Sequence, residues 1–204
     1  MTVQADTAII GGGIVGMACA AALLRRFPRR TLVVLEKETR VGAHQSSHNS
    51  GVIHSGIYYR PESLKAKLCV KGAAAMQEFC RTYDLPLRVC GKVIVAVSDA
   101  EVPTLHELAT RGAANRVPDL AILSRDELHT LEPHAAGVAA LQVPGTAITD
   151  YGKVTAKLAE RVEAAGGTVL RAAKVTAIVA SASQMVLETT AGSITATRIV
   201  NCAG

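Results

Sequence analysis

The stretch from Ser46 to Tyr59, which reads SSHNSGVIHSGIYY, concentrates side chains that could do chemistry. It holds histidine imidazoles, serine hydroxyls, an asparagine amide, paired tyrosines and glycines. An imidazole titrates near neutral pH and can act as a general base. Hydroxyls, amides and exposed glycine backbone can approach a polar ligand closely and bond to it. We therefore expect this stretch to line a functional site.

A glycine run earlier in the chain indicates a second site. Gly11, Gly13 and Gly16 match the pattern G-x-G-x-x-G of dinucleotide-binding proteins. In that pattern the first glycine permits a tight turn out of a strand, the second lets the backbone approach a pyrophosphate, and the third lets a helix pack closely on the sheet. The helix N-terminus then offers N–H groups and a partial positive charge to the phosphates.

Glu36 ends the next apolar segment, about 20 residues after Gly16, where such proteins carry an acidic residue. Its carboxylate can accept hydrogen bonds from the hydroxyls of an adenosine ribose, and it would repel a 2′-phosphate, which argues against NADP. The alternative is an ordinary β-α-β unit with a glycine turn and a surface glutamate. The context favours an ADP-containing dinucleotide but does not choose between NAD and FAD.

These residues need a scaffold, which the apolar pattern predicts. A strand at Thr7–Ile10, a helix at Ile14–Arg26 and a strand at Thr31–Leu35 form a β-α-β unit. Lys37–Tyr59 lacks periodicity and is predicted to be a long functional loop with at most one helical turn. A helix is predicted to begin at Pro61 and to end near Tyr83.

The rest of the chain alternates between strand and helix signals. Strands are predicted at Arg88–Val97, Val138–Val143, Ala147–Ile148, Thr168–Leu170, Val175–Val179, Met185–Thr189, Ser193–Ala196 and Arg198–Asn201. Helices are predicted from a cap at Asp99 to about Ala113, and from the capping box Ser124–Glu127 to a point before Pro133. A further helix is predicted from a cap at Asp150 to Ala165, with Gly166 and Gly167 as the stop.

Composition restricts the class of protein. Apolar residues make up 49% of the chain and charged residues 19%, so a large core is expected. Aromatic residues make up only 3%, so that core must consist of Val, Leu, Ile and Ala, as in parallel sheets covered by helices. The net charge of +5 is dispersed, and its densest run, Arg25–Arg30, is interpreted as a helix end and a solvated turn. We therefore expect no nucleic-acid partner.

Cysteine and histidine usage points to a reduced, metal-free protein. The cysteines form no C-x-x-C pair, so we expect free and mostly buried thiols. The histidines lack metal-ligand spacing, so no metal is expected. No signal sequence opens the chain and no apolar run is long enough to span a bilayer, so a cytoplasmic location is expected.

The loop itself favours FAD over NAD. A classical NAD enzyme carries a helix-bearing crossover after its second strand, whereas a polar loop follows here. We expect Gly42, Ala43, Ser46 and Ser47 to run along a pyrophosphate and ribityl chain. We expect Asn49, Ser50, Gly51 and His54–Gly56 to cover a flavin ring, whose edge is rich in hydrogen-bonding atoms.

At this point a family resemblance becomes specific. The segments GGGIVG, VVLEKE and SSHNSGVIHSGIYYRPESLKAKLCVKGA (Ser46–Ala73) resemble the FAD-dependent D-amino-acid oxidase superfamily, and within it the L-2-hydroxyglutarate oxidase/dehydrogenase family. The terminal segment RIVNCAG resembles the second FAD motif of these flavoproteins. The resemblance spans essentially the whole chain. Family members continue well past the second motif, so we expect this chain to be a fragment.

The resemblance implies an α/β fold, with a Rossmann-like FAD-binding βαβ domain and part of an α+β substrate domain. Residues 1–88 are expected to hold the fingerprint and flavin loop, 89–147 part of the substrate domain, and 148–204 the return to the FAD-binding domain. The expected cofactor is FAD. The cofactor contacts expected are Gly11, Gly13, Gly16, Glu36, Lys37, Ser46, Ser47, Asn49, Ser50, Gly51, Val175, Ala203 and Gly204.

The implied reaction is oxidation of L-2-hydroxyglutarate to 2-oxoglutarate, with oxygen or a membrane quinone as electron acceptor. Peripheral attachment to the inner face of the cell membrane is left open. His54 is the candidate base or flavin-edge contact, weighed evenly against a structural histidine. The dicarboxylate substrate needs cations, for which Arg60 and Lys65 are the candidates, and Tyr58 and Tyr59 either line the pocket or pack the loop.

Three alternatives stay open. A related flavin oxidase acting on an amino acid or on glycerol phosphate shares the fingerprint. A non-catalytic nucleotide-binding fragment fits the abrupt C-terminus. An NAD-dependent dehydrogenase is disfavoured by the polar loop after Glu36.

Overall fold

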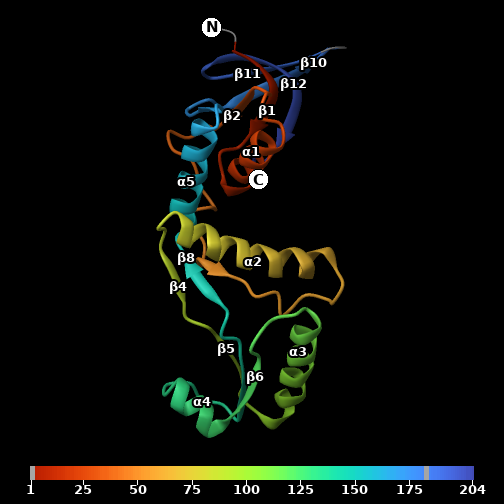
Figure 1. Ribbon diagram of the computed structural model, residues 1–204, viewed down its shortest axis with the longest axis vertical. Helices are drawn as coiled ribbons and strands as arrows, with labels where there is room; N and C mark the ends of the chain where they lie inside the picture. Colours follow the sequence, from red (N-terminus) through yellow and green to blue (C-terminus); the bar gives the residue numbers. More distant parts are fainter. Residues whose placement is uncertain (1–2, 182–183) are drawn as a thin grey trace. The chain divides into compact units, whose positions relative to one another are not determined.

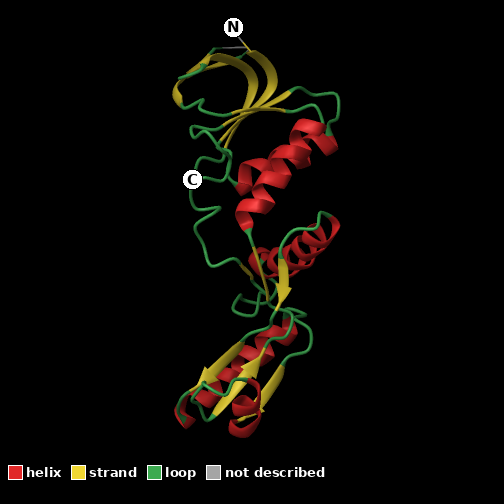
Figure 2. Ribbon diagram, turned by 90° about the vertical axis from the view of Figure 1, so that its left-hand side faces the viewer, coloured by secondary structure: helices red, strands yellow, loops and turns green. Residues whose placement is uncertain are grey.

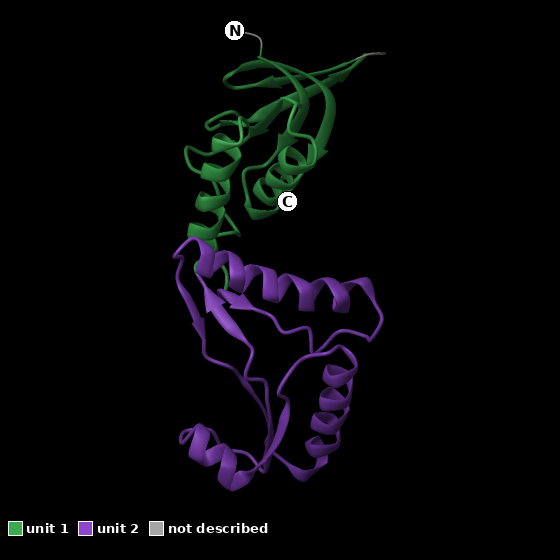
Figure 3. Cartoon of the chain, in the orientation of Figure 1, with its two compact units in different colours: residues 1–49, 150–204 green, residues 50–149 purple. Residues whose placement is uncertain are grey.

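The computed structural model describes residues 3–181 and 184–204. The chain divides into two compact units, which Figure 3 distinguishes by colour: unit 1 comprises residues 1–49 and 150–204, and unit 2 comprises residues 50–149. Residues 50–88 therefore belong to the same compact unit as 89–149. The regions 1–88, 89–147 and 148–204 describe expected roles in binding FAD and substrate, and their assignment stays a prediction.

Unit 1 is built on a six-stranded sheet with the strand order β10-β11-β12-β1-β2-β9. The strands are β1 (Val3–Ile10), β2 (Leu32–Leu35), β9 (Thr168–Leu170), β10 (Val175–Ala180), β11 (Met185–Thr189) and β12 (Gly192–Asn201). Strands β12, β1, β2 and β9 run parallel, whereas β10, β11 and β12 pair antiparallel. Figures 1 and 2 show this sheet with its helices.

Two helices, α1 (Ile14–Arg26) and α5 (Tyr151–Ala164), pack against each other and cover one face of the sheet. Ile9 and Val34 face these helices and join one core cluster. Ala8 and Val33 face the opposite way and join a second cluster with residues of β11 and β12. Because strands β1 and β2 are buried on both faces, their sequences read as continuous apolar runs.

The predicted β-α-β unit is confirmed, and its helix α1 spans the residues that were predicted for it. The helix predicted after Asp150 is also confirmed, because the Asp150 carboxylate accepts a hydrogen bond from the Lys153 N–H at 3.0 Å. Gly166 follows α5 with a φ of +85°, which suits glycine at a helix end. The prediction of two strand pieces in 193–201 was wrong: β12 is continuous because it pairs with β1 along its length and with β11 over its first half.

Unit 2 contains two three-stranded sheets, ordered β3-β8-β4 and β5-β7-β6. Its strands are β3 (Val52–Ile53), β4 (Leu87–Val89), β5 (Val93–Ala96), β6 (Ala121–Ser124), β7 (Ala139–Gln142) and β8 (Ala147–Thr149). Its helices are α2 (Leu64–Thr82), the 3-10 turn η1 (Asp99–Glu101), α3 (Val102–Ala114) and α4 (Arg125–Leu131). Helix α3 packs on the second sheet through the core cluster around Leu105 and Leu141.

Several boundaries in unit 2 differ from the predictions. Helix α2 begins at Leu64 and not at Pro61, because Glu62 has a φ of +65° and the Ser63 hydroxyl caps the helix. The predicted strand Arg88–Val97 is split into β4 and β5 by a turn at Gly91, where φ is +69°. The predicted loop to Tyr59 contains the short strand β3.

The two helix caps predicted in unit 2 had opposite outcomes. Asp99 does not cap α3 but lies inside the turn η1, and Glu101 holds the cap position of α3. The capping box at Ser124 and Glu127 is confirmed, with both of its hydrogen bonds formed. The bond from the Ser124 backbone N–H is the main reason why the pKa of the Glu127 carboxyl is lowered.

Candidate functional site

The glycine turn between β1 and α1 leaves no room for side chains. Gly11 has a φ of +105°, and a Cβ atom there would lie 2.4 Å from the carbonyl oxygen of Cys202. A Cβ atom at Gly16 would lie 2.0 Å from the carbonyl oxygen of Gly11. The first and third glycines of the pattern are therefore required by the turn and by helix packing, as the pattern predicts.

The N-terminus of α1 has unpaired donors. Among the residues that the structure describes, no acceptor bonds to the backbone N–H groups of Gly13, Val15 or Gly16. The N–H of Ile14 is bonded to the hydroxyl oxygen of Ser46 at 3.0 Å. A Cβ atom at Gly13 would contact only that same hydroxyl, at 3.3 Å. Unpaired N–H groups at an uncrowded helix N-terminus fit an anionic phosphate group.

Glu36 lies at the end of β2 beside this turn. Its Oε2 atom accepts a hydrogen bond from the Gly12 N–H at 2.7 Å, and its Oε1 atom accepts one from the Glu38 N–H at 2.9 Å. The residue is only 8% exposed, so the alternative of a surface glutamate is wrong. Each carboxylate oxygen keeps a lone pair, so this oriented group can still accept hydrogen bonds from ribose hydroxyls.

The terminal motif also meets the glycine turn. Strand β12 pairs with β1 up to the pair Ile10↔Asn201. Beyond it, the Cys202 N–H donates to the Ile10 carbonyl at 2.8 Å, and Ala203 lies beside Gly11. Gly204 is exposed, with a φ of +97°. The two segments that resemble FAD motifs, although they lie at opposite ends of the chain, are thus neighbours in unit 1.

The segment after β2 is tied to the connection that leads into β10. The Ala173 N–H donates to the carbonyl oxygen of Glu36 at 2.8 Å. Lys37 is exposed, with its side chain in solvent. Val175 opens β10 and packs against the second core cluster of unit 1. Their cofactor contacts stay predictions.

The start of the polar loop packs beside the glycine turn. The Gly42 N–H donates to the Gly12 carbonyl at 3.0 Å, and the Ser47 hydroxyl donates to the Gly42 carbonyl at 2.6 Å. The Asn49 amide donates back within the loop, to the carbonyl oxygen of Ser46 at 3.1 Å. The Ser46 hydroxyl hydrogen has no acceptor among the described residues, so it can be donated to a ligand. Ser50 and Gly51, also predicted contacts, fall in unit 2, and Gly51 has a φ of +70°.

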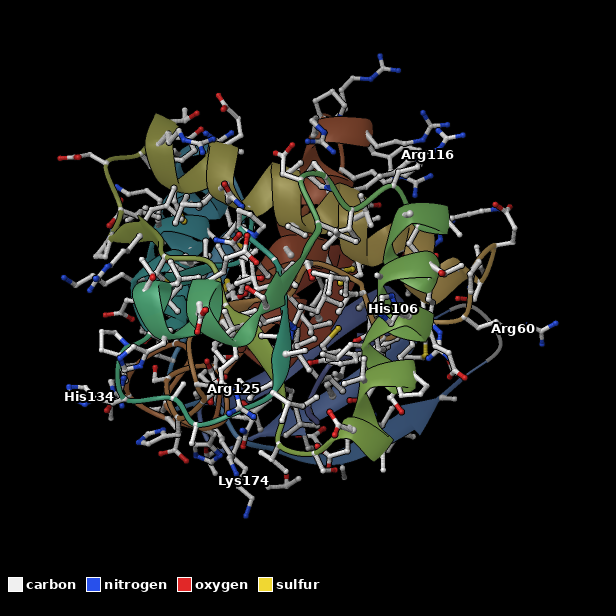
Figure 4. The ribbon with its side chains drawn as sticks, turned by 90° about the horizontal axis from the view of Figure 1, so that it is seen from below. Arg60, His106, Arg116, Arg125, His134 and Lys174 are labelled. Atoms are coloured by element: carbon white, nitrogen blue, oxygen red, sulfur yellow. The ribbon has the colours of Figure 1, made fainter. Side chains whose placement is uncertain are left out.

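The predicted substrate residues all lie in unit 2. His54 is exposed, and its backbone carbonyl accepts a hydrogen bond from the Cys69 thiol at 3.3 Å. The Lys65 ammonium lies 5.2 Å from the centre of the Tyr59 ring. Arg60 is exposed and its side chain extends away from the ribbon (Figure 4).

Sequence reasoning missed two cations beside Tyr58, whose side chain is 49% exposed. The Lys92 ammonium donates to the Tyr58 hydroxyl at 3.3 Å and lies 4.3 Å from the centre of its ring. The Arg111 guanidinium donates to the Tyr58 carbonyl at 3.4 Å. Both cations are distant in sequence, so only a prediction of the β5 and α3 packing would have found them.

The cysteines and the possible metal ligands form no further candidate site among the described residues. All five cysteines are free, but the expectation of mostly buried thiols was wrong, because only Cys80 is buried and Cys90 is exposed. Burial raises the pKa of the Cys69 thiol, which keeps it protonated. Within residues 3–181 and 184–204, no three His, Cys, Asp or Glu side chains gather as a metal site. No helix in these ranges has the length and apolar character needed to cross a bilayer.

Comparison with known proteins identifies the family. Residues 6–204 match the family described as FAD dependent oxidoreductase, and the chain belongs to this family. The resemblance found in the sequence is thereby confirmed, as are the fold class and FAD as the family's cofactor. The unpaired N–H groups, the oriented Glu36 carboxylate and the neighbouring terminal motif fit that cofactor.

Curated relatives carry a more specific name. The chain is 48% identical over 165 residues to the mitochondrial L-2-hydroxyglutarate dehydrogenase of Homo sapiens. The aligned residues make up 81% of this chain and 36% of that protein. It is 42% identical over 196 residues to L-2-hydroxyglutarate dehydrogenase of Indibacter alkaliphilus, and here the aligned residues make up 96% of this chain and 49% of that protein. The chain thus spans between a third and a half of the length of these relatives.

Solved structures show the same fold. L-alpha-glycerophosphate oxidase from Mycoplasma pneumoniae, solved with FAD bound, superposes with a TM-score of 0.89 and 28% sequence identity. The superposition covers 98% of this chain and 54% of the oxidase chain. Glycine oxidase from Geobacillus kaustophilus superposes with a TM-score of 0.83 and 26% sequence identity, over 99% of this chain and 56% of the oxidase chain.

Proposed function

We propose that this chain takes part in the FAD-dependent oxidation of L-2-hydroxyglutarate to 2-oxoglutarate. The observation that carries the proposal is the identity of 48% to a protein of that name, against 28% and 26% for the glycerophosphate and glycine oxidases. Fold similarity alone would not choose among these substrates. The sequence similarity supports the hydroxy acid L-2-hydroxyglutarate as the substrate.

Unit 1 supplies the groups that hold the cofactor in this proposal. The free N–H groups of Gly13, Val15 and Gly16 bind the diphosphate, and the Ser46 hydroxyl donates beside them. The Glu36 carboxylate accepts hydrogen bonds from the adenosine ribose. Bound FAD supplies the acceptor for the hydride that leaves the substrate C2.

The chain must also remove one proton. Converting the C2 alcohol to a ketone releases a hydride from carbon and a proton from the hydroxyl oxygen. His54 is the proposed base, because a neutral imidazole can take that proton near pH 7. Arg60 and Lys65 are the proposed partners of the substrate carboxylates, and Tyr58 and Tyr59 are the proposed pocket residues.

The electrons are proposed to pass finally to oxygen or to a quinone. A cytoplasmic location, with peripheral attachment at the inner face of the cell membrane left open, stays part of the proposal. The word mitochondrial in the names of eukaryotic relatives describes those proteins.

The test is anaerobic reduction of the bound cofactor. The purified protein should be yellow, and L-2-hydroxyglutarate without oxygen should bleach its flavin absorbance. Bleaching by glycerol 3-phosphate or by glycine instead would overturn the proposal in favour of a related oxidase. The similarity to L-alpha-glycerophosphate oxidase is the observation that favours this alternative function. A colourless protein that binds NADH would overturn the flavin assignment for this chain.

A further inference from the structure

Asn115, the residue that caps the C-terminus of α3, holds the turn that follows His54. The Asn115 amide Nδ2 donates to the carbonyl oxygens of Gly56, at 3.0 Å, and of Tyr59, at 2.8 Å. Asn115 is only 9% exposed, and its Oδ1 atom has no hydrogen-bond partner within the described residues. All the hydrogen bonding of this side chain is thus directed to one segment of the loop.

The two carbonyls that Asn115 holds enclose a tight turn. The Tyr59 N–H donates to the Gly56 carbonyl at 3.3 Å, and Gly56 has a φ of +89°. Between them, Ile57 is fully buried in the core cluster that includes residues of α3. A Cβ atom at Gly112 would lie 3.0 Å from Ile57 Cγ1, so the contact with α3 is close. The turn therefore has one apolar anchor and one polar anchor.

The residues proposed for chemistry are attached to this turn. His54 precedes Gly56 by two residues, and Tyr58 and Tyr59 form its end. Neither tyrosine side chain is buried, and His54 is exposed, so packing does not fix them. Their position depends on the backbone that carries them. The only other side chain that donates to a carbonyl of the turn is Arg111 among the described residues, and its distance of 3.4 Å is longer.

We propose that Asn115 is a positioning residue, which fixes the backbone of Gly56–Tyr59 and thereby the placement of His54 and the tyrosines. The two donated hydrogen bonds act together, because one amide group spans both ends of the turn. Removing the amide leaves the Tyr59 carbonyl without a donor among the described residues and the Gly56 carbonyl with only the Tyr59 N–H, in a mostly buried setting. The catalytic consequence rests on the proposed function, whereas the structural consequence does not.

The structural test compares Asn115→Leu with Thr110→Val by hydrogen exchange, in the protein as it is purified. Leucine has a similar volume and no donor, and Thr110 is an exposed residue of the same helix whose hydroxyl donates only to the His106 carbonyl. We expect amides of residues 54–60 to exchange at least ~10-fold faster in Asn115→Leu, while those of α3 keep their protection. Equal acceleration throughout unit 2, or none at 54–60, would overturn the proposal.

Asn115→Ser serves if the leucine variant does not fold, because serine is smaller and cannot crowd the site. It retains one donor at most and cannot span both carbonyls, so the same local acceleration is expected. Asn115→Asp has the shape of asparagine without its donors and should behave as Asn115→Leu does. An aspartate variant with wild-type exchange at 54–60 would count against the proposal.

The catalytic test is the limiting rate of anaerobic flavin reduction by L-2-hydroxyglutarate. We expect this rate to fall by ~10- to ~100-fold in Asn115→Leu, since small displacements of reacting groups have effects of this size. FAD affinity and the rate for Thr110→Val should stay unchanged. Faster exchange without slower reduction would overturn the positioning role. If the wild-type protein is not reduced at all, the proposed function fails, and hydrogen exchange still decides the role of Asn115 in holding the turn.

Discussion

Glu36 Oε2 accepts a hydrogen bond from the Gly12 N–H at 2.7 Å, although Gly12 occupies a position that the dinucleotide pattern leaves free. A Cβ atom at Gly12 would lie 2.8 Å from that same oxygen and 2.9 Å from the Glu36 Cβ. Gly12 must therefore lack a side chain so that the carboxylate can reach the turn. The contact orients the acidic group before any ligand arrives.

Replacing this carboxylate should weaken FAD binding. In Glu36→Gln one acceptor oxygen becomes an amide donor, which cannot accept from the Gly12 N–H or from a ribose hydroxyl. Because hydrogen bonds to charged groups contribute about 1.5–3 kcal/mol, the FAD dissociation constant should rise by ~10- to ~100-fold, measured by fluorescence titration. Glu38→Gln is the control, since among the described residues that side chain bonds only to His44. Unchanged affinity in Glu36→Gln would exclude a role for Glu36 in binding.

Two glycine-to-alanine changes should have opposite effects. Gly16→Ala places a Cβ atom 2.0 Å from the Gly11 carbonyl oxygen and should prevent FAD retention and lower the melting temperature. Gly72→Ala, in the middle of α2, meets nothing within 4 Å and should raise the free energy of unfolding by ~0.5–1 kcal/mol. Thermal unfolding with and without FAD measures both. A Gly16→Ala protein that stays yellow and stable would contradict the tight packing of the turn.

His54→Ala should leave the fold intact, because the side chain is exposed and forms no hydrogen bond within the described residues, where the backbone carbonyl accepts the bond from the Cys69 thiol. If His54 takes the substrate proton, flavin reduction by L-2-hydroxyglutarate should slow by ~10²- to ~10⁴-fold, as for loss of a general base. Stopped-flow absorbance measures this rate, and His106→Ala, on the exposed side of α3 (Figure 4), is the control. Reduction at the wild-type rate would remove His54 from the mechanism.

Acid should weaken the link between β1 and the residue before β2. The Asp6 carboxylate accepts hydrogen bonds from the Thr31 N–H at 2.8 Å and from its hydroxyl at 3.0 Å, and these bonds hold the pKa of Asp6 below its usual range. The folded state therefore binds this proton less readily than the unfolded state. The stabilisation is present above the usual aspartate pKa, about 3.9, and is lost as pH falls through the lower folded-state pKa.

The measurement is the difference in melting temperature between wild type and Asp6→Asn. Wild type should be the more stable protein near neutral pH, and the difference should shrink as pH falls below about 4. A difference that stays constant down to about pH 3 would contradict the role of the Asp6 charge.

Local sequence signals predicted the elements of unit 1 well. The spacing of Ile14–Arg26 and the Asp150 cap depend on contacts within a few residues, and both were found as expected. The continuity of β12 could not be read in this way, because it depends on pairing with β1, which lies far away in the sequence. The division at 49–50 and 149–150 likewise results from long-range packing.

The candidate site shows the same contrast. The glycine pattern predicted where side chains are excluded, since Gly11 and Gly16 meet backbone atoms. The sequence did not reveal that Gly12 binds Glu36, nor that Asn115 and Lys92 reach the tyrosine turn, because these contacts join residues from separate elements. Pro61 misled the prediction of the start of α2, where the Ser63 hydroxyl supplies a stronger local signal.

The position of β12 has a consequence for biosynthesis. Strand β1 leaves the ribosome long before its neighbour β12, because paired residues of the two strands are 191 positions apart, from Val3↔Ile194 to Ile10↔Asn201. Until that partner is translated, one edge of the nascent glycine turn has no covering strand, and closing so long a loop is slow. FAD capture is therefore expected to wait until β12 has been translated, and a premature stop before β12 should give a polypeptide that cannot retain FAD.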